Sequence, residues 1–428
     1  MKSTIEPIAT IEPIDCEDWH RLDNTGKAYP LIRSNQQTTL FRLTAVLTEH
    51  VDPIRIEEAL KIILPRFPYF QVVLKPGFFW YYFEKTIRIT PVQKDKHYPC
   101  TQYEKRWAVP PIHIYYKDNR LSLEMTHALS DGYGGTVFLK ALLNSYFEVN
   151  SEDDNEYNLQ KLPVKQEWED SCDIYFDPSV PQSKRGNAAF HLPCKRVSQG
   201  IYYSTTGILP LKEVLTRAKA EGASLTQWLS AKYITVLTEM IEDNNWKPAP
   251  VVLNIPVDLR RLYPSKTLRN FFVTLTPTID SRIGHFSFSE ILSHVKNFMS
   301  IQVDRRYISQ QLKRNINLER AMSIRMLPLI IKRIFFPFFF YHLGERQYSG
   351  GFSNLGNFKL PLKTAEKVKE VHILVPPSQG TLIKAGCISY GSQLYITFGS
   401  LTENRELERK FFSQLRKEGI PVRIEVNY

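Results

Sequence analysis

The sequence predicts an α/β protein built from two similar layered domains, each with a mixed sheet flanked by helices. Its 428 residues leave room for two domains of about 150 residues or more, each with a core of its own. Both halves combine strand-like alternation with helix-like spacing, and neither follows a strict strand–helix–strand order. A polar segment punctuated by prolines separates the halves.

The first half begins its regular structure with a helix over residues 53–64. Asp52 followed by Pro53 combines an N-cap residue with a proline at the first helical position, and Pro65 ends the pattern. Alternating apolar and polar residues then predict strands at 71–74 and 78–84, and a hairpin with strands at 113–116 and 121–126.

The hairpin ends on His127, and a glycine-rich turn follows it. Asp131 and Gly132 lie in this turn, and apolar residues recur at helical spacing from Val137 to Phe147. His127 is therefore expected at the carboxyl end of a strand, just before a helix. Strand ends of this kind commonly carry the chemistry of open α/β sheets.

The acidic stretch at residues 150–156 is expected to be a loop, and the domain boundary belongs nearby. The predicted division is an N-terminal domain at 1–165, a crossover linker at 166–200 and a C-terminal domain at 201–428. In the second half, Ser224 and Gln227 form a capping-box pattern ahead of a helix. The other elements expected there are strands at 202–209, 251–257, 271–278, 369–375, 381–389 and 393–398, and helices at 288–314 and 404–419.

Composition restricts the partners without choosing one. The net charge of +11 favours anionic partners, namely polyphosphate-bearing ligands, acidic proteins, anionic lipid surfaces or nucleic acid. No nucleic-acid-binding signature is present, so that class is set aside. Five widely spaced cysteines without a CxxC pair and an N-terminus without an apolar signal segment predict a cytoplasmic protein with reduced thiols.

One strongly apolar run, at 326–341, is interrupted by charges and prolines and is too short to span a bilayer. It has three interpretations: buried core, the wall of an acyl-chain pocket, or a surface that rests on a membrane. The core interpretation is preferred because apolar segments are most often core. Peripheral membrane contact stays open.

His127, Asp131 and Gly132 together form an HxxxDG pattern at a strand-to-helix turn. In this pattern the chain resembles the acyltransferases related to chloramphenicol acetyltransferase, and most closely the bacterial alcohol acetyltransferase-like group. It lacks the DFGWG motif of the plant branch and the second histidine that condensation domains usually carry. Further stretches that carry the resemblance are residues 19–24, 256–261, 268–272 and 353–356.

The resemblance implies a pseudo-dimer of two similar domains with an active-site tunnel between them. It implies that His127 is the general base in direct transfer of an acyl group from acyl-CoA, or from a carrier protein's pantetheine, to a hydroxyl acceptor. Asp131 would hold an arginine, Arg260 or Arg261, and Gly132 would let the backbone approach the substrate. A monomer is expected, with an alcohol or a lipid-like molecule as acceptor and no bound cofactor.

Oxyanion stabilisation needs preorganised donors, and Asn270, Ser353 and Asn354 are the candidates. The same residues are equally typical of strand ends and turns.

Several rival interpretations remain beside the acyltransferase. The glycines after Asp131 fail the GxGxxG spacing of a dinucleotide site, no nucleophile elbow is present, and no histidine or cysteine pairs have metal-ligand spacing. The HxxxDG pattern itself could be a structural histidine followed by a helix-capping aspartate. A carrier-dependent, amide-forming condensation enzyme and a non-catalytic binding or docking member of the same fold stay as alternatives.

Overall fold

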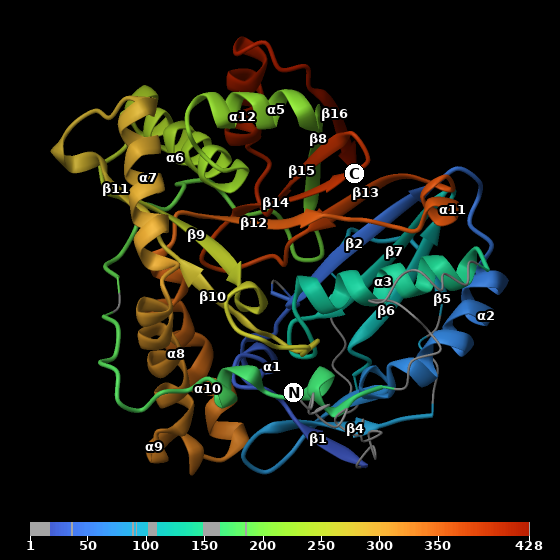
Figure 1. The fold of residues 1–428 in the computed structure, drawn as a ribbon. Helices are drawn as coiled ribbons and strands as arrows, with labels where there is room; N and C mark the ends of the chain where they lie inside the picture. Colours follow the sequence, from blue (N-terminus) through green and yellow to red (C-terminus); the bar gives the residue numbers. More distant parts are fainter. Residues whose placement is uncertain are drawn as a thin grey trace, which may run out of the picture.

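The computed structural model describes residues 18–427 except 36, 88–89, 91, 102–108, 149–162 and 185, so the acidic stretch at 150–156 lies outside the described residues. Two sheets organise the molecule, one with five strands and one with eight, and a three-stranded sheet lies at one end (Figure 1). Helices cover both large sheets. The predicted α/β architecture with mixed sheets is confirmed.

The five-stranded sheet has the order β13-β2-β7-β6-β5. Its hairpin β6–β7 lies within one residue of its predicted bounds. The helix that follows begins at Gly132, which was expected in the turn, and so starts five residues before the apolar spacing that predicts it from Val137. Asp131 caps that helix, α3, and Asp52 caps α2 by accepting the amide of Ile54. The first-half elements are β1 (Trp19–Arg21), α1 (Tyr29–Ile32), β2 (Leu40–Leu47), α2 (Pro53–Ile63), β3 (Val72–Pro76), β4 (Tyr81–Lys85), β5 (Val92–Lys94), β6 (Ile112–Lys117), β7 (Arg120–Thr126) and α3 (Gly132–Tyr146).

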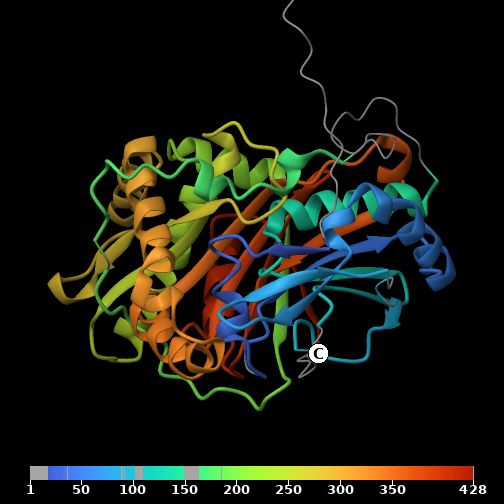
Figure 2. The same cartoon turned by 90° about the horizontal axis from the view of Figure 1, so that it is seen from below.

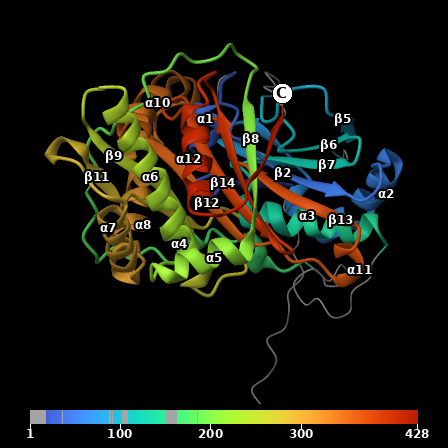
Figure 3. The same cartoon turned by 90° about the horizontal axis from the view of Figure 1, so that it is seen from above.

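The eight-stranded sheet has the order β10-β9-β12-β14-β15-β8-β16, with β11 added on β9. Helices α5, α6 and α12 lie over it in the view from above (Figure 3). The second-half elements are α4 (Ser171–Ile174), β8 (Tyr203–Pro210), α5 (Leu211–Ala220), α6 (Leu225–Asp243), β9 (Pro250–Asp258), β10 (Phe272–Leu275), β11 (Thr278–Asp280), α7 (Phe288–Gln302), α8 (Arg305–Arg320), α9 (Met322–Arg325), α10 (Leu329–Leu343), β12 (Gly350–Asn357), α11 (Leu362–Ala365), β13 (Val368–Leu374), β14 (Ile383–Tyr390), β15 (Gln393–Ser400), α12 (Glu406–Lys417) and β16 (Arg423–Asn427).

Two predicted elements are split. The strand expected at 271–278 is two strands, β10 and β11, which both pair with β9. The helix expected at 288–314 is α7 followed by α8, because Asp304 caps a new helix by accepting the amide of Arg306. The capping box of Ser224 and Gln227 is present at the start of α6.

One strand of the C-terminal half joins the sheet of the first half, which the sequence does not indicate. β13 leaves the C-terminal half and pairs antiparallel with β2 along most of its length, so that Val371 lies opposite Ala45. Tyr390 and Tyr395 also pack into the core of the first half. The halves are therefore joined by a shared sheet and a shared core, and the division at 165 and 201 remains a prediction.

The apolar run at 326–341 forms most of α10, which lies on the surface with α8 and α9 at one end of the molecule (Figure 2). The preferred core interpretation is therefore wrong, because most of the large apolar side chains of α10 are exposed. Among the described residues, no helix has the length and apolarity needed to cross a membrane.

Glu408 is buried in α12, and burial raises its pKa from 4.5 to about 7 despite the nearby Arg405 guanidinium. The folded protein therefore binds this proton more tightly than the unfolded chain. The stabilising contribution is present below pH 4.5 and is lost as the pH rises to about 7. We expect Glu408→Gln to raise the free energy of unfolding by roughly 2 to 3 kcal/mol more at pH 8 than at pH 4.5. Urea denaturation at both pH values measures this difference, and an equal effect at both would contradict it. The exposed Glu403→Gln is the matched control.

Candidate active site

His127 follows the last residue of β7 and lies in the turn that leads to α3. Its amide donates to the carbonyl of Thr39 at 3.0 Å, which fixes the start of the turn. It is partly exposed, whereas every other residue from 121 to 131 is buried. The ring stacks on Tyr29 at a centroid distance of 5.0 Å, and Phe41 and Phe272 flank it. The turn thus presents one imidazole in an aromatic surrounding.

Asn270 lies beside one ring nitrogen of His127 and favours a hydrogen on that atom. The Asn270 Nδ2 donates to the His127 carbonyl at 2.8 Å and to Asp23 Oδ2 at 3.0 Å, so its Oδ1 is the atom that faces the ring, 3.4 Å from Nδ1. A carbonyl oxygen only accepts, so the contact favours a hydrogen on Nδ1. Nε2 then carries the lone pair that a general base requires.

Burial lowers the pKa of His127 to about 4, although Asn270 and the charge of Asp131 act in the opposite direction. The charge of Lys384, on β14, lowers the pKa of His127 further. The imidazole is therefore neutral at physiological pH, which is the form that can accept a proton.

Asp131 points away from His127 and joins the two halves. Its Oδ1 accepts the amides of Tyr133 and Gly134, which caps α3. Its Oδ2 accepts from Arg260 Nη1 at 2.9 Å and from the amide of Phe271 at 3.0 Å. Arg260 is the partner of Asp131, and Arg261 is exposed and makes no such pair. The ion pair is buried on both sides.

Arg260 is itself held at each guanidinium nitrogen. Nε donates to the carbonyl of Thr267 at 2.8 Å, Nη2 to that of Arg269 at 2.6 Å, and Nη1 also reaches Asp258 at 2.8 Å. This network shapes the loop between β9 and β10, and that loop delivers Asn270 to His127.

Gly132 has a packing role. A Cβ at this position would lie 2.5 Å from Leu355 Cδ2, so the space beside it is filled by a side chain of β12. That Gly132 also lets the backbone approach the substrate stays a prediction. The contact also shows that β12 passes alongside the His127 turn.

The three oxyanion candidates have different surroundings. Both amide hydrogens of Asn270 are used by Asp23 and the His127 carbonyl. Asn270 is therefore a positioning residue, and the expectation that it donates to an oxyanion is corrected. Asn354 donates to Thr226 and accepts the amide of Gly356, as a turn-stabilising residue does. Ser353 is partly exposed on β12, and its hydroxyl has no hydrogen-bond partner among the described residues. Ser353 stays the open candidate.

Glu370, His372 and Glu425 offer ligand atoms within 4.8 Å of one another. These groups are already paired, because Arg423 binds Glu370 at 2.6 Å and Glu425 at 3.0 Å, and His372 contacts Glu370 at 2.9 Å. An arginine between the carboxylates opposes a cation there. The cluster instead links β13 to β16 across the two large sheets.

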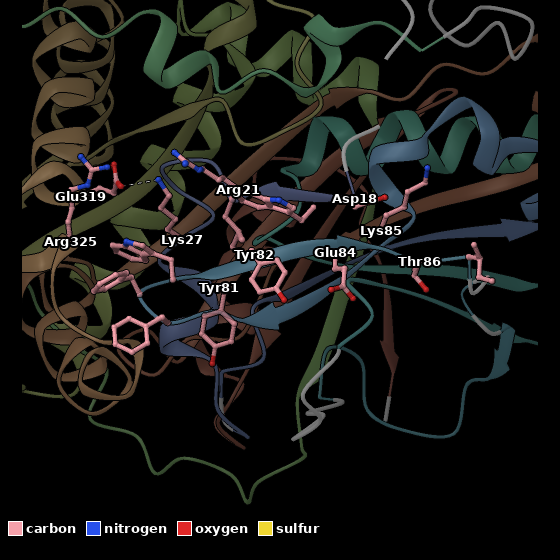
Figure 4. Close-up of a pocket in the computed structure, with 16 residues that line it drawn as sticks. Asp18, Arg21, Lys27, Tyr81, Tyr82, Glu84, Lys85, Thr86, Glu319 and Arg325 are labelled. Atoms are coloured by element: carbon pink, nitrogen blue, oxygen red, sulfur yellow. Dashed lines mark hydrogen bonds and ion pairs between the residues drawn. The ribbon is translucent and has the colours of Figure 1, made fainter. Parts of the chain in front are cut away.

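A cavity of about 1060 Å³ lies at the three-stranded sheet, and His127 is not among its lining residues. Tyr81 and Tyr82 of β4 extend along it, and Lys27 reaches toward Glu319 at one end, where Arg325 also lies (Figure 4). Leu22 and Lys27 belong to its wall, and Asp23 and Tyr29 of the same segment contact the His127 site. The expected tunnel between the halves stays a prediction.

Two residues of the site were missed by the sequence reasoning. Asp23 is buried and orients Asn270, and burial raises the pKa of Asp23 to about 6 against the charge of Arg269. Tyr29 stacks on the catalytic candidate from a four-residue helix. Asp23 lies within residues 19–24, one of the stretches that carry the resemblance, whereas nothing in the sequence points to Tyr29.

Comparison with known proteins finds the same fold among solved structures but no match by sequence. No protein-family model matches the chain, and no curated protein matches its sequence. The trichothecene 15-O-acetyltransferase TRI3 from Fusarium sporotrichioides has a similar structure, with a TM-score of 0.61, 11% identity and coverage of 97% of this chain and 99% of that chain. TRI101 of F. graminearum, crystallised with coenzyme A and deoxynivalenol, has a TM-score of 0.62 and 10% identity, with coverage of 93% of this chain and 97% of that chain. The condensation domain of the monacolin K polyketide synthase MokA has a TM-score of 0.58 and 11% identity, with coverage of 92% of this chain and 95% of that chain.

The chain therefore has the two-domain fold of the chloramphenicol acetyltransferase-like acyltransferases and condensation domains. At these identities the likeness defines the fold, and the reaction has to be argued from the site.

Proposed function

We propose that the protein is an acyltransferase that moves an acyl group from acyl-CoA directly to a hydroxyl acceptor, with His127 as general base. The observation that carries the proposal is the state of the imidazole: neutral, partly exposed at a strand end, and oriented by Asn270 so that Nε2 holds the lone pair. The solved structures of the same fold that bind coenzyme A or are named O-acetyltransferases support this choice of donor and acceptor.

The proposed reaction has two steps. Nε2 accepts the hydroxyl proton as the acceptor oxygen attacks the thioester carbonyl and forms the new C–O bond. The tetrahedral intermediate then collapses, the C–S bond breaks, and the imidazolium returns the proton to the leaving thiolate. Ser353 is the proposed donor to the intermediate's oxygen, because its hydroxyl is free among the described residues.

Asp131, Arg260 and Asn270 act as positioning residues in this proposal. They hold the turn and the ring from both halves of a single chain, so one copy supplies all three. We therefore propose a monomer as the functional unit.

The test is mass-spectrometric detection of acylated product and free coenzyme A. The purified protein is incubated with an acyl-CoA ladder and with mixed alcohol and amine acceptors. We expect ester products and stoichiometric release of coenzyme A. Formation of amides alone would contradict the hydroxyl acceptor, and hydrolysis without transfer would contradict the acyltransferase.

A carrier-dependent condensation reaction is the second candidate, and the structural similarity to the MokA condensation domain favours it. The same chemistry at His127 would then use a carrier protein's pantetheine thioester as donor. Acyl-pantetheine and acyl-carrier arms in the same assay separate the two donors, because only a carrier-dependent enzyme would leave acyl-CoA unused.

The pH profile of the reaction provides a further prediction. With the pKa of His127 at about 4, the essential base of the free enzyme is unprotonated over the neutral range. We expect kcat/KM to stay level from about pH 8 to pH 6 and to fall only as the pH approaches the pKa. Stopped assays in a constant-ionic-strength buffer series measure this. An inflection near the ordinary histidine pKa of 6.5 would contradict the buried, neutral imidazole.

A further inference from the structure

Helix α10 turns most of its large apolar side chains to the solvent and its lysine toward the protein. Ile330, Ile334 and Phe338 follow one another at intervals of four residues and are 75%, 66% and 61% exposed. Lys332, in contrast, is 3% exposed. A surface helix in a water-soluble domain typically keeps its solvent face polar, so this row of exposed apolar side chains is unusual.

Contacts with the β3–β4 turn fix this orientation. Lys332 Nζ donates to the Phe79 carbonyl at 2.9 Å and lies 3.6 Å from the ring centre of Trp80, and the Leu329 amide donates to the Phe78 carbonyl at 2.8 Å. Burial lowers the pKa of Lys332 to about 8. The outward direction of the phenylalanines is therefore set by a specific polar anchor on the inner face.

The exposed apolar side chains form a concentrated surface. Of the 24 large apolar side chains exposed in the described part of the chain, ten lie between residues 322 and 341. Phe78 and Phe79 are exposed on the turn that α10 is bonded to. We define the docking surface as Phe78, Phe79 and the exposed apolar residues of 322–341; it lies at the end of the molecule that also carries β1 and β4 (Figure 1).

The helical segment that carries most of the docking surface has charges of one sign, and acidic side chains near it, such as Glu319, lie on the cavity side. The sequence contains no aspartate or glutamate from residue 320 to residue 344. Arg325 and Arg333 are exposed, and their guanidinium groups form no ion pair with any described residue. An apolar surface edged by unpaired arginines is complementary to an anionic lipid headgroup layer above an acyl interior.

We propose that the docking surface binds the face of a membrane that contains anionic lipids. The helix would lie in the interfacial plane, since it is too short and too interrupted to cross the bilayer. A second copy of the chain is a poorer occupant, because a two-fold contact through this face would bring the same arginines together. The proposal concerns binding and does not depend on the proposed acyl transfer.

The docking surface also shares residues with the large cavity. Phe78 and Phe79 belong to the docking surface and also line the cavity. Arg325, at the edge of the docking surface, lines the cavity as well (Figure 4). Membrane binding in this orientation would place the aromatic cavity of about 1060 Å³ on the membrane side of the molecule.

Co-sedimentation of the full chain with vesicles tests the proposal. One vesicle set is phosphatidylcholine alone and the other contains phosphatidylglycerol. We expect binding to the anionic set, with the partition coefficient lowered about tenfold or more in Phe335→Ser/Phe338→Ser. The matched control is Ile62→Ser/Ile283→Ser, which removes two exposed apolar side chains elsewhere.

The charge is tested by Arg325→Glu/Arg333→Glu against Lys61→Glu/Lys219→Glu, which changes net charge equally at distant exposed positions. We expect the arginine variant to lose more binding than the lysine variant. Equal loss in both would mean that net charge alone attracts the protein and would overturn the proposal. So would unchanged binding of the phenylalanine variant, or a dimer in light scattering that this variant dissociates.

Discussion

Replacing His127 with alanine is expected to lower kcat/KM for acyl transfer by about 10²- to 10⁴-fold, the range typical for loss of a general base. The substitution removes the group whose Nε2 would accept the proton and leaves Asn270, Asp131 and Arg260 in their places. Because the ring is partly exposed and makes one side-chain hydrogen bond, a long one of 3.4 Å, the fold should survive. Steady-state kinetics on the best donor and acceptor pair give the ratio.

Two controls make the result interpretable. His50→Ala removes an exposed histidine outside the site and should leave the rate unchanged. Circular dichroism and urea denaturation establish that the His127→Ala protein is folded. Equal rates in wild type and the folded variant would show that His127 is not the base, and the HxxxDG pattern would then be a structural turn.

Local patterns predicted the site's local structure well. Alternation in Leu121, Leu123 and Met125 places the strand within one residue of where it occurs. Helical spacing from Val137 predicts α3, although the helix begins earlier, at Gly132. The helix caps at Asp52 and Ser224 could be predicted equally well, because a capping side chain accepts from amides two or three residues away. These features depend on short-range interactions alone.

The misses depend on contacts between distant residues. β2 is buried at all eight positions, so it shows no alternation, and its pairing with β13 joins residues more than 300 positions apart. Asn270 was expected as an oxyanion donor, but its amide hydrogens are already used by Asp23 and the His127 carbonyl. The sequence did not reveal this because both partners come from remote segments. For α10, a helix that is apolar on all sides does not reveal which face turns inward.

Loss of the Asp131–Arg260 pair is expected to have the largest effect on stability. Both side chains are buried, with 8% and 7% exposure. Arg260→Met would leave the Asp131 carboxylate without its counter-charge in a buried position, and removal of one partner of such a pair typically costs about 3 to 5 kcal/mol. Urea denaturation of the full chain measures the loss. Arg261→Met is the matched control, since Arg261 is the exposed neighbour that does not pair with Asp131.

Asp131→Asn should cost less than Arg260→Met. Asparagine keeps the cap of α3, and Arg260 retains Asp258 at 2.8 Å and the carbonyls of Thr267 and Arg269. In the double variant Asp131→Asn/Arg260→Met no buried charge is left uncompensated, so its loss should be smaller than the sum of the single losses. Additive losses would show that the two residues stabilise the halves independently. A positive coupling would identify the pair as the contact through which the β9–β10 loop, and with it Asn270, is held against the His127 turn.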